Sequence, residues 1–461
     1  MSSSLVALYT LLQYYGFDPY YGYLSQLTST IGQKNWLSNY LALIFPITFS
    51  FFLLETNRRY KIILFLLLTI LYTALIIGQS RGIWISIITT LLFSLVFIYR
   101  YGLWEVFRNN KKWLIALLTI FLVVTVIYST ENPLNKSSLT VIERAASTFD
   151  ENDPSINTRL LILETTMEMI KNKPILGLGI GAFSYHYLDY QAAYLVKHPE
   201  YIKFSGKAAE AHNEYLHLAA EIGIAGLFSF LTIIYIFYYL IYQYLEKEKN
   251  KNYKIIIFGL LAGVTCFLIH CLFTFPFHVP VLGTTFFILL GLTIAYINLT
   301  EKGKGNDSAK NIVLIHFKFN ALYRTIAIVI LIVLAVTGLW KIALKPYLAE
   351  LYYFKGARHF AVHNNEVALK YFKKAALYDS NNGRVMHALG SAYYQLDFQE
   401  EAKQYLQKTL KIYKDRNTFR NLGLSYRQSG DFEQAKKYFQ LAIYIDPKYY
   451  HAYHDLASLF V

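Results

Sequence analysis

Three arginines have the residue type and the position that binding of a phosphorylated group requires. Arg81 stands between two apolar stretches, in GQSRGIWIS, whereas Arg144 and Arg159 stand in the polar segments IERAASTF and SINTRLLIL. A guanidinium is planar and permanently charged, and it binds phosphate through two parallel hydrogen bonds. Because charge is costly near the membrane, Arg81 is either an anion-binding residue or a snorkelling side chain at a helix end. For Arg144 and Arg159 the alternative is a solvated surface position.

A histidine and an asparagine precede a predicted helix without being needed for its packing. His212 and Asn213 stand at the start of AHNEYLHLAAEIGIAGLF. A neutral imidazole accepts a proton from a hydroxyl, so His212 is a candidate general base, with a structural histidine at a helix N-terminus as the alternative. Asn213 either caps the helix or orients a substrate hydroxyl.

The spacing of other histidines and glycines predicts neither a metal site nor a nucleotide site. His212 and His217 are five residues apart, so they do not share a helix face as in a His-Glu-x-x-His zinc site. The segment GLGIGAF follows no predicted strand and lacks the spacing of a dinucleotide-binding loop. It predicts a tight turn that brings the backbone close to a partner, and Gly177 and Gly179 are therefore candidate substrate contacts.

The elements that position these residues are predicted to be membrane helices. Hydrophobic residues make up 55% of the chain, and they gather in blocks of about 18–22 residues, the length that crosses a bilayer. The blocks cover residues 37–54, 62–78, 82–99, 113–128, 222–244, 255–272, 280–298 and 325–343. Between the fourth and fifth blocks lies a long polar loop, residues 129–221, which divides the membrane helices into the ranges 1–128 and 222–344.

Basic residues fall in every second loop of this arrangement. They occupy 55–61, 100–113, 246–254 and 301–310, with Lys318 and Arg324 following the last of these. Lys and Arg are retained on the cytoplasmic side of a membrane, so the loop 129–221 and the chain after residue 344 are predicted to face outward. The same bias explains the net charge of +14 without a nucleic-acid partner, for which the sequence has no reader motif.

The last quarter of the chain repeats itself. Gly356, Gly390 and Gly423 are separated by 34 and 33 residues, and alanines and aromatic or leucine residues recur at the same step. This period and residue order are typical of tetratricopeptide repeats, in which two helices per repeat stack into a solenoid. The fold class is therefore predicted to be all-α, a polytopic membrane helix bundle followed by a repeat domain at residues 345–461, which would bind a protein or peptide partner.

Four segments together resemble the bacterial O-antigen ligase and polymerase superfamily. They are, in chain order, TIGQKNWLSNYLAL, SRGIWIS, TRLLILETTMEMIKNKPILGLGIGAF and AHNEYLHLAAEIGIAGLFSF, and the resemblance covers roughly residues 5–300. It implies a GT-C-like membrane bundle with a large periplasmic loop. Arg81 is similar to the membrane-edge arginine of the family, Arg159 to its loop arginine and His212 to its essential loop histidine. The family has more N-terminal helices than this chain presents, and we expect those helices to be missing here.

The resemblance also implies a reaction and its partners. Such enzymes take a glycan from a polyprenyl pyrophosphate at the outer face of the bacterial inner membrane, and they need no metal or nucleotide cofactor. The acceptor is a hydroxyl of lipid A core, of a growing polysaccharide or of a protein, and the sequence leaves these three alternatives open. A second hypothesis is a membrane-anchored repeat scaffold for envelope polysaccharide assembly, with no catalysis of its own.

Overall fold

A computed structural model of the chain describes residues 2–17, 29–137, 139–147, 153–302 and 321–460. Within these ranges the regular structure is helical and contains no strand, which confirms the predicted all-α class. Most of the predicted basic loop 301–310, and Lys318 after it, lie outside the described residues.

Eight helices within the described ranges are long and apolar enough to cross a membrane, as the hydropathy pattern predicts. They are α2 (Lys34–Leu54), α3 (Arg58–Ile77), α4 (Arg81–Arg100), α6 (Lys111–Ser129), α10 (Glu214–Lys247), α11 (Lys251–His270), α12 (Pro280–Lys302) and the continuous helix formed by α13 (Ala321–Gly338), a π-helical turn (Leu339–Leu344) and α14 (Lys345–Ala361). The chain is therefore a multi-pass membrane protein by length and composition of its helices.

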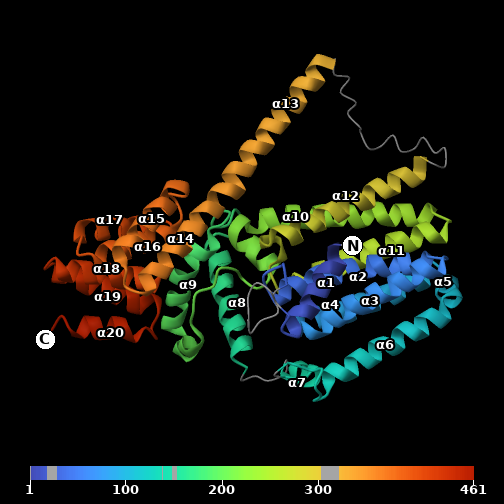
Figure 1. The fold of residues 1–461 in the computed structure, drawn as a ribbon, viewed down its shortest axis with the longest axis horizontal. Helices are drawn as coiled ribbons and strands as arrows, with labels where there is room; N and C mark the ends of the chain where they lie inside the picture. The colour runs from blue at the N-terminus through green and yellow to red at the C-terminus, as the bar shows by residue number, and fades with distance from the viewer. Residues whose placement is uncertain (1, 18–28, 138, 148–152, 303–320, 461) are drawn as a thin grey trace. The chain divides into compact units, whose positions relative to one another are not determined.

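The chain forms two compact units, one made of residues 1–178 and 210–312 and the other of residues 179–209 and 313–461. In the first unit α11 packs against both α2 and α4, and α2 also packs on α3 (Figure 1). Small residues permit the close approach of α11 to α2: a Cβ atom on Gly263 would lie 2.3 Å from the Leu43 carbonyl oxygen. Small-residue contacts of this kind hold helices together where lipid removes the hydrophobic driving force. The short helices α1 (Ser2–Tyr14), α5 (Trp104–Asn109) and α7 (Val141–Ala146) complete this part of the unit.

The polar loop contributes a helix to the same unit, α8 (Pro154–Asn172), which packs against α10. α10 begins at Glu214, directly after Asn213 as predicted and two turns before the apolar block that starts at residue 222, and it is kinked at Gly223, where φ is 69°. The turn after α8 fits into this kink, since Leu178 N donates to the Ala220 carbonyl at 2.9 Å. Added Cβ atoms would lie 2.3 Å from the Glu221 carbonyl at Gly177 and 2.0 Å from the Ile175 carbonyl at Gly223. The predicted tight turn is therefore present, and its backbone contacts the kink of α10.

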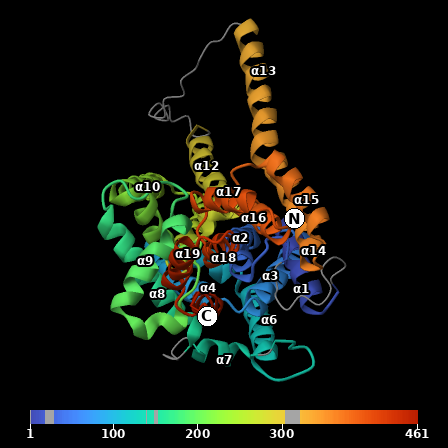
Figure 2. The same cartoon turned by 90° about the vertical axis from the view of Figure 1, so that its left-hand side faces the viewer.

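The second unit contains the repeats. Helices α14 and α15 (Asn365–Tyr378), α16 (Gly383–Gln395) and α17 (Gln399–Leu410), and α18 (Arg416–Gln428) and α19 (Phe432–Ile445) form three hairpins, and α20 (Tyr450–Ala457) follows them (Figures 1 and 2). The recurring glycines lie where the two helices of a hairpin touch. A Cβ atom on Gly356, Gly390 or Gly423 would lie 2.6 Å from Phe372, Leu406 or Phe439, respectively. The period of the repeat in the sequence is therefore explained by the close packing of the two helices within each hairpin.

The second half of the polar loop packs on these repeats. It forms α9 (Phe183–Lys197) and a 3-10 helix (Pro199–Phe204). Asp189 of α9 makes an ion pair with Lys414, between α17 and α18. Lys448, after α19, donates to the carbonyl oxygens of Lys203 at 3.1 Å and Ser205 at 2.7 Å. The sequence predicts one continuous loop domain at 129–221, whereas residues 179–209 cluster with the repeats.

Candidate active site

The first residue of α4 and the residue that caps α8 form an ion pair. Arg81 Nη1 lies 2.9 Å from Asp153 Oδ2, and the two side chains are only 12% and 14% exposed. Arg81 Nη1 also donates to the Ser147 carbonyl at 2.9 Å. The second oxygen of Asp153 accepts from Ser155 N and so caps α8. This arrangement excludes a simple snorkelling role for Arg81, because its guanidinium is bound by the polar loop.

Arg144 and Arg159 add positive charge near this ion pair. Burial lowers the pKa of Arg159, and the charges of Arg81 and Arg144 lower it further, while Asp153 opposes them. Burial and Arg81 likewise lower the pKa of Arg144. The Nε atom of Arg144 is buried and has no hydrogen-bond partner among the described residues. Three guanidinium groups therefore lie close together with one carboxylate in the described part of the chain, which favours binding of an anion.

A lysine that the sequence analysis does not identify extends this cationic group. Lys34 begins α2 and lies within electrostatic reach of both Arg144 and Arg81. Its position at the start of a predicted span, in GQKNW, is the signal that could have indicated it, by the same argument that identifies Arg81. Anion-binding groups thus come from α2, from α4 and from both helices of the polar loop that precede residue 178.

His212 lies within electrostatic reach of Arg159, in an environment that favours its neutral form. Burial lowers the pKa of its imidazole to about 4, and the charge of Arg159 contributes to the shift. Its ring packs edge-on against Phe275, with 5.1 Å between the ring centroids. Its backbone has a φ of 53°, a left-handed conformation that costs a non-glycine residue roughly 1–3 kcal/mol and that occurs often at functional sites. A neutral imidazole next to an anion-binding group is able to accept a proton.

Asn213 holds the start of α10. Its side-chain oxygen accepts a hydrogen bond from Leu216 N at 3.1 Å, which is the geometry of a helix N-cap. Of the two predicted roles, the structure therefore contains the cap, and a contact with a substrate hydroxyl stays a prediction. The approach of Gly177 to α10 accounts for that glycine by packing alone. Gly179 belongs to the second unit, and substrate contacts by either glycine stay predictions.

A second group of ionisable side chains also lies near Phe275. His217 and Glu221, one turn apart on α10, meet His278 of the 3-10 turn Pro276–His278. Burial lowers the pKa of His278, but the hydrogen bond to Glu214 and the charges of Glu214, Glu221 and Glu210 outweigh it and raise the pKa overall. The prediction that there is no metal site considered the spacing of His212 and His217. It did not consider His278, which is distant in sequence. The signal that could have been used is the helical spacing of Glu214, His217 and Glu221.

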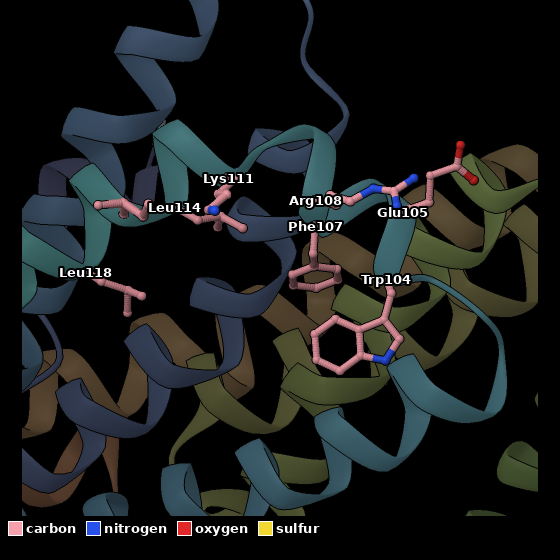
Figure 3. A pocket seen from close by; sticks show the side chains of 8 residues that line it. Trp104, Glu105, Phe107, Arg108, Lys111, Leu114 and Leu118 are labelled. Atoms are coloured by element: carbon pink, nitrogen blue, oxygen red, sulfur yellow. The ribbon is translucent and has the colours of Figure 1, made fainter.

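A well-defined pocket lies elsewhere. It has a volume of about 430 Å³ and lies at the bend between α5 and α6, in the predicted cytoplasmic loop 100–113. Figure 3 shows the rings of Trp104 and Phe107 and the side chain of Leu118 around it. The lining contains no histidine and no paired carboxylates, so it offers neither a general base nor the clustered arginines of the site at Arg81.

Comparisons with known proteins agree with these observations. Residues 64–231 match the family model described as O-Antigen ligase, a range that includes Arg81, Arg144, Arg159 and His212. Residues 383–415 and 417–449 match models of the tetratricopeptide repeat. Response regulator aspartate phosphatase E of Bacillus subtilis (strain 168) is 29% identical over 127 residues, which cover 24% of this chain. The match spans about a third of that relative, 34% of its length.

Proposed function

We propose that this chain, which carries an O-antigen ligase domain followed by tetratricopeptide repeats, transfers a glycan from polyprenyl pyrophosphate to a hydroxyl acceptor. The observation that carries the proposal is the convergence of Arg81, Arg144 and Arg159, with one opposing carboxylate in the described residues, beside a neutral His212. An anion site next to a proton acceptor is what transfer from a phosphorylated donor to a hydroxyl requires.

The arginines act on the leaving group. The acceptor oxygen forms a bond to the anomeric carbon of the donor sugar, and the bond from that carbon to the pyrophosphate oxygen breaks. Negative charge then accumulates on the pyrophosphate, which Arg144 and Arg159 bind. Because this charge is larger in the transition state than in the ground state, fixed guanidinium groups stabilise the transition state more than the bound donor. Arg81, already paired with Asp153, positions the polar loop and adds its remaining donors.

His212 acts on the acceptor. A sugar or protein hydroxyl loses its proton as it attacks, and the neutral imidazole accepts this proton. A pKa of about 4 keeps His212 unprotonated at neutral pH. Removal of one general base of this kind costs about 100- to 10,000-fold in rate. The N-cap bond of Asn213 fixes the start of α10 and, with it, the position of the preceding histidine.

The charge pattern of the loops supports the outer face of the bacterial inner membrane as the location of this chemistry. The basic loops between the spans support a cytoplasmic position for 55–61, 100–113 and 246–254. The loop 129–221, which holds Arg144, Arg159 and His212, then lies outside, where lipid-linked glycans are assembled. Lipid A core, a growing polysaccharide and a protein are the candidate acceptors, and the repeats are candidates for binding a protein partner.

A scaffold without catalysis is the second candidate function, and the packing of α9 on the repeats favours it. The ion pair between Asp189 and Lys414 fixes part of the polar loop to the repeat domain, so a partner bound there would be coupled to the loop. Deletion of the repeats and His212→Ala separate the two functions. If the deletion abolishes polysaccharide assembly and His212→Ala leaves it unchanged, the chain is a scaffold.

The proposed roles are tested by measuring donor binding and transfer separately. The full chain in lipid nanodiscs would receive a polyprenyl pyrophosphate-linked oligosaccharide carrying a labelled sugar, with a membrane lipid and glycan extract as acceptor. His212→Ala is expected to keep donor binding and lose transfer, whereas Arg159→Ala loses donor binding. The half-buried His198 and the exposed Arg58 provide the controls His198→Ala and Arg58→Ala. Full transfer by His212→Ala, or unchanged donor binding by Arg159→Ala, would contradict the assignment of that residue.

A further inference from the structure

Two histidines and one glutamate outside the arginine site have the arrangement of metal ligands. His217 Nε2 lies 3.4 Å from Glu221 Oε1, one helical turn further along α10. The ring of His278 lies 4.1 Å from that of His217, measured between centroids. One ligand atom from each of the three side chains lies within 4.8 Å of the other two. His217 and Glu221 are buried, whereas 32% of the His278 side chain is exposed.

These separations suit a small divalent ion. Zinc binds histidine nitrogen and carboxylate oxygen at about 2.0–2.2 Å in tetrahedral geometry, so two of its ligand atoms lie about 3.3–3.5 Å apart. The distance from His217 Nε2 to Glu221 Oε1 already has this value. Two imidazoles and one carboxylate are a typical ligand set for zinc, and they leave a fourth position open to water or a substrate group. The exposed edge of His278 gives solvent access to that position.

A buried carboxylate orients one of the histidines. Glu214 is completely buried, and its Oε1 lies 3.4 Å from His278 Nδ1. Its Oε2 accepts from Phe277 N at 3.2 Å, and its own backbone N donates to the Cys271 carbonyl at 2.8 Å. Metal-binding histidines commonly donate their second ring nitrogen to a carboxylate, which fixes the tautomer and the ring orientation. Glu214 thus leaves Nε2 of His278 for a metal ion.

His217 requires one change when a metal binds. Ala211 N donates to His217 Nδ1 at 3.3 Å, which places the ring proton on Nε2, the side of Glu221. A metal ion bound to Nε2 requires the other neutral tautomer, with the ring proton on Nδ1. The long hydrogen bond from Ala211 is then exchanged for a metal–nitrogen bond. Because a protonated histidine must lose a proton before it binds a metal ion, we expect binding to strengthen as the pH rises.

We propose that His217, Glu221 and His278 bind a divalent transition-metal ion of the zinc class, with Glu214 as the carboxylate that orients His278. This inference goes beyond the proposed transfer reaction and does not rest on it. It also differs from the metal-free chemistry that the family resemblance implies. The ion would join the start of α10 to the turn after α11. Phe275, before that turn, lies near both sites, with its ring centroid 5.1 Å from that of His212 and 6.4 Å from that of His278.

The experiment is a titration of the purified full chain, stripped with a chelator, with Zn²⁺ and separately with Co²⁺. We expect one ion per chain with a dissociation constant below about 1 μM, and visible absorption bands of tetrahedral Co²⁺. His217→Ala and His278→Ala should each weaken binding at least about 100-fold. Circular dichroism would report whether each variant folds. If loss of the buried His217 prevents folding, His278→Ala and the conservative Glu221→Gln still test the site.

The controls separate this site from other histidines and from the transfer reaction. His198→Ala and His212→Ala should bind the metal as the wild type does, because neither residue belongs to the cluster. No donor or acceptor is present in the titration, so a failure of the proposed transferase activity leaves its result unchanged. The proposal is overturned if the folded wild type binds Zn²⁺ no more tightly than His278→Ala. It is equally overturned if Glu221→Gln and His278→Ala both retain wild-type affinity, since another site then holds the ion.

Discussion

The pH dependence of transfer is set by the environment of His212. Burial and the charge of Arg159 lower the pKa of this imidazole to about 4, well below the value of about 6.5 for an exposed histidine. A base with a pKa of 4 is about 97% unprotonated at pH 5.5, whereas one with a pKa of 6.5 is about 9% unprotonated. Transfer that depends on this base should therefore stay nearly constant from pH 8 to pH 5.5, instead of falling about tenfold.

The assay is kcat/KM for transfer of the labelled glycan by the full chain in nanodiscs, because this quantity reports pKa values of the free enzyme. Arg159→Lys retains the positive charge and should keep the profile, whereas residual activity of Arg159→Ala should decline at higher pH than that of Arg159→Lys. The substitution to alanine removes a charge that disfavours the imidazolium. A wild-type profile that halves near pH 6.5 would refute the reasoning, since His212 would then titrate as an exposed group.

Three other predictions concern the elements that support the site. Gly177→Ala should lower the yield and thermal stability of the folded chain far more than Gly181→Ala. Both glycines have a positive φ, but an added Cβ atom would meet backbone at 2.3 Å at Gly177 and no atom within 4 Å at Gly181. Equal melting temperatures of the two variants would contradict the packing role of Gly177. Asn213→Ala should cost about 1 kcal/mol of stability through the lost cap, and Asn213→Asp should restore both stability and transfer; restored stability without transfer would instead indicate a substrate contact by the amide. Lys414→Ala should make the segment 179–209 more sensitive to limited proteolysis than the exposed-site control Lys411→Ala, and identical cleavage rates would show that the ion pair with α9 does not hold this segment.

Local patterns in the sequence predicted the fold well. Each membrane span is a block of apolar residues, and in each repeat a glycine lies opposite a large side chain of the next helix. Both patterns are formed by residues close together in the sequence, so they can be recognised without the structure. The apolar span was predicted from residue 222, whereas the helix itself begins eight residues earlier, directly after the predicted cap Asn213. The first two turns of this helix carry Glu214, His217 and Glu221, whose polar side chains lower the hydropathy although the backbone is helical.

The candidate site could be predicted only in part. Residue type and position identified Arg81, Arg144, Arg159 and His212, and the resemblance to O-antigen ligases implied family roles for Arg81, Arg159 and His212. The pairing of Arg81 with Asp153, 72 residues away, depends on how the polar loop folds back to α4, which no local pattern contains. The contact between His217 and His278 was not predicted for the same reason. It depends on a turn after α11 that returns to α10, and the spacing of the two histidines in the sequence does not indicate that turn.

The measurement that tests the central claim most directly is the pool of polyprenyl-linked glycan in cells that carry the wild-type chain, a deletion, His212→Ala or His198→Ala. If the chain transfers glycan with His212 as base, the deletion and His212→Ala both accumulate the lipid-linked donor, while His198→Ala resembles the wild type. If neither the deletion nor His212→Ala changes the pool, the chain is not the transferase, and the repeat domain becomes the functional part.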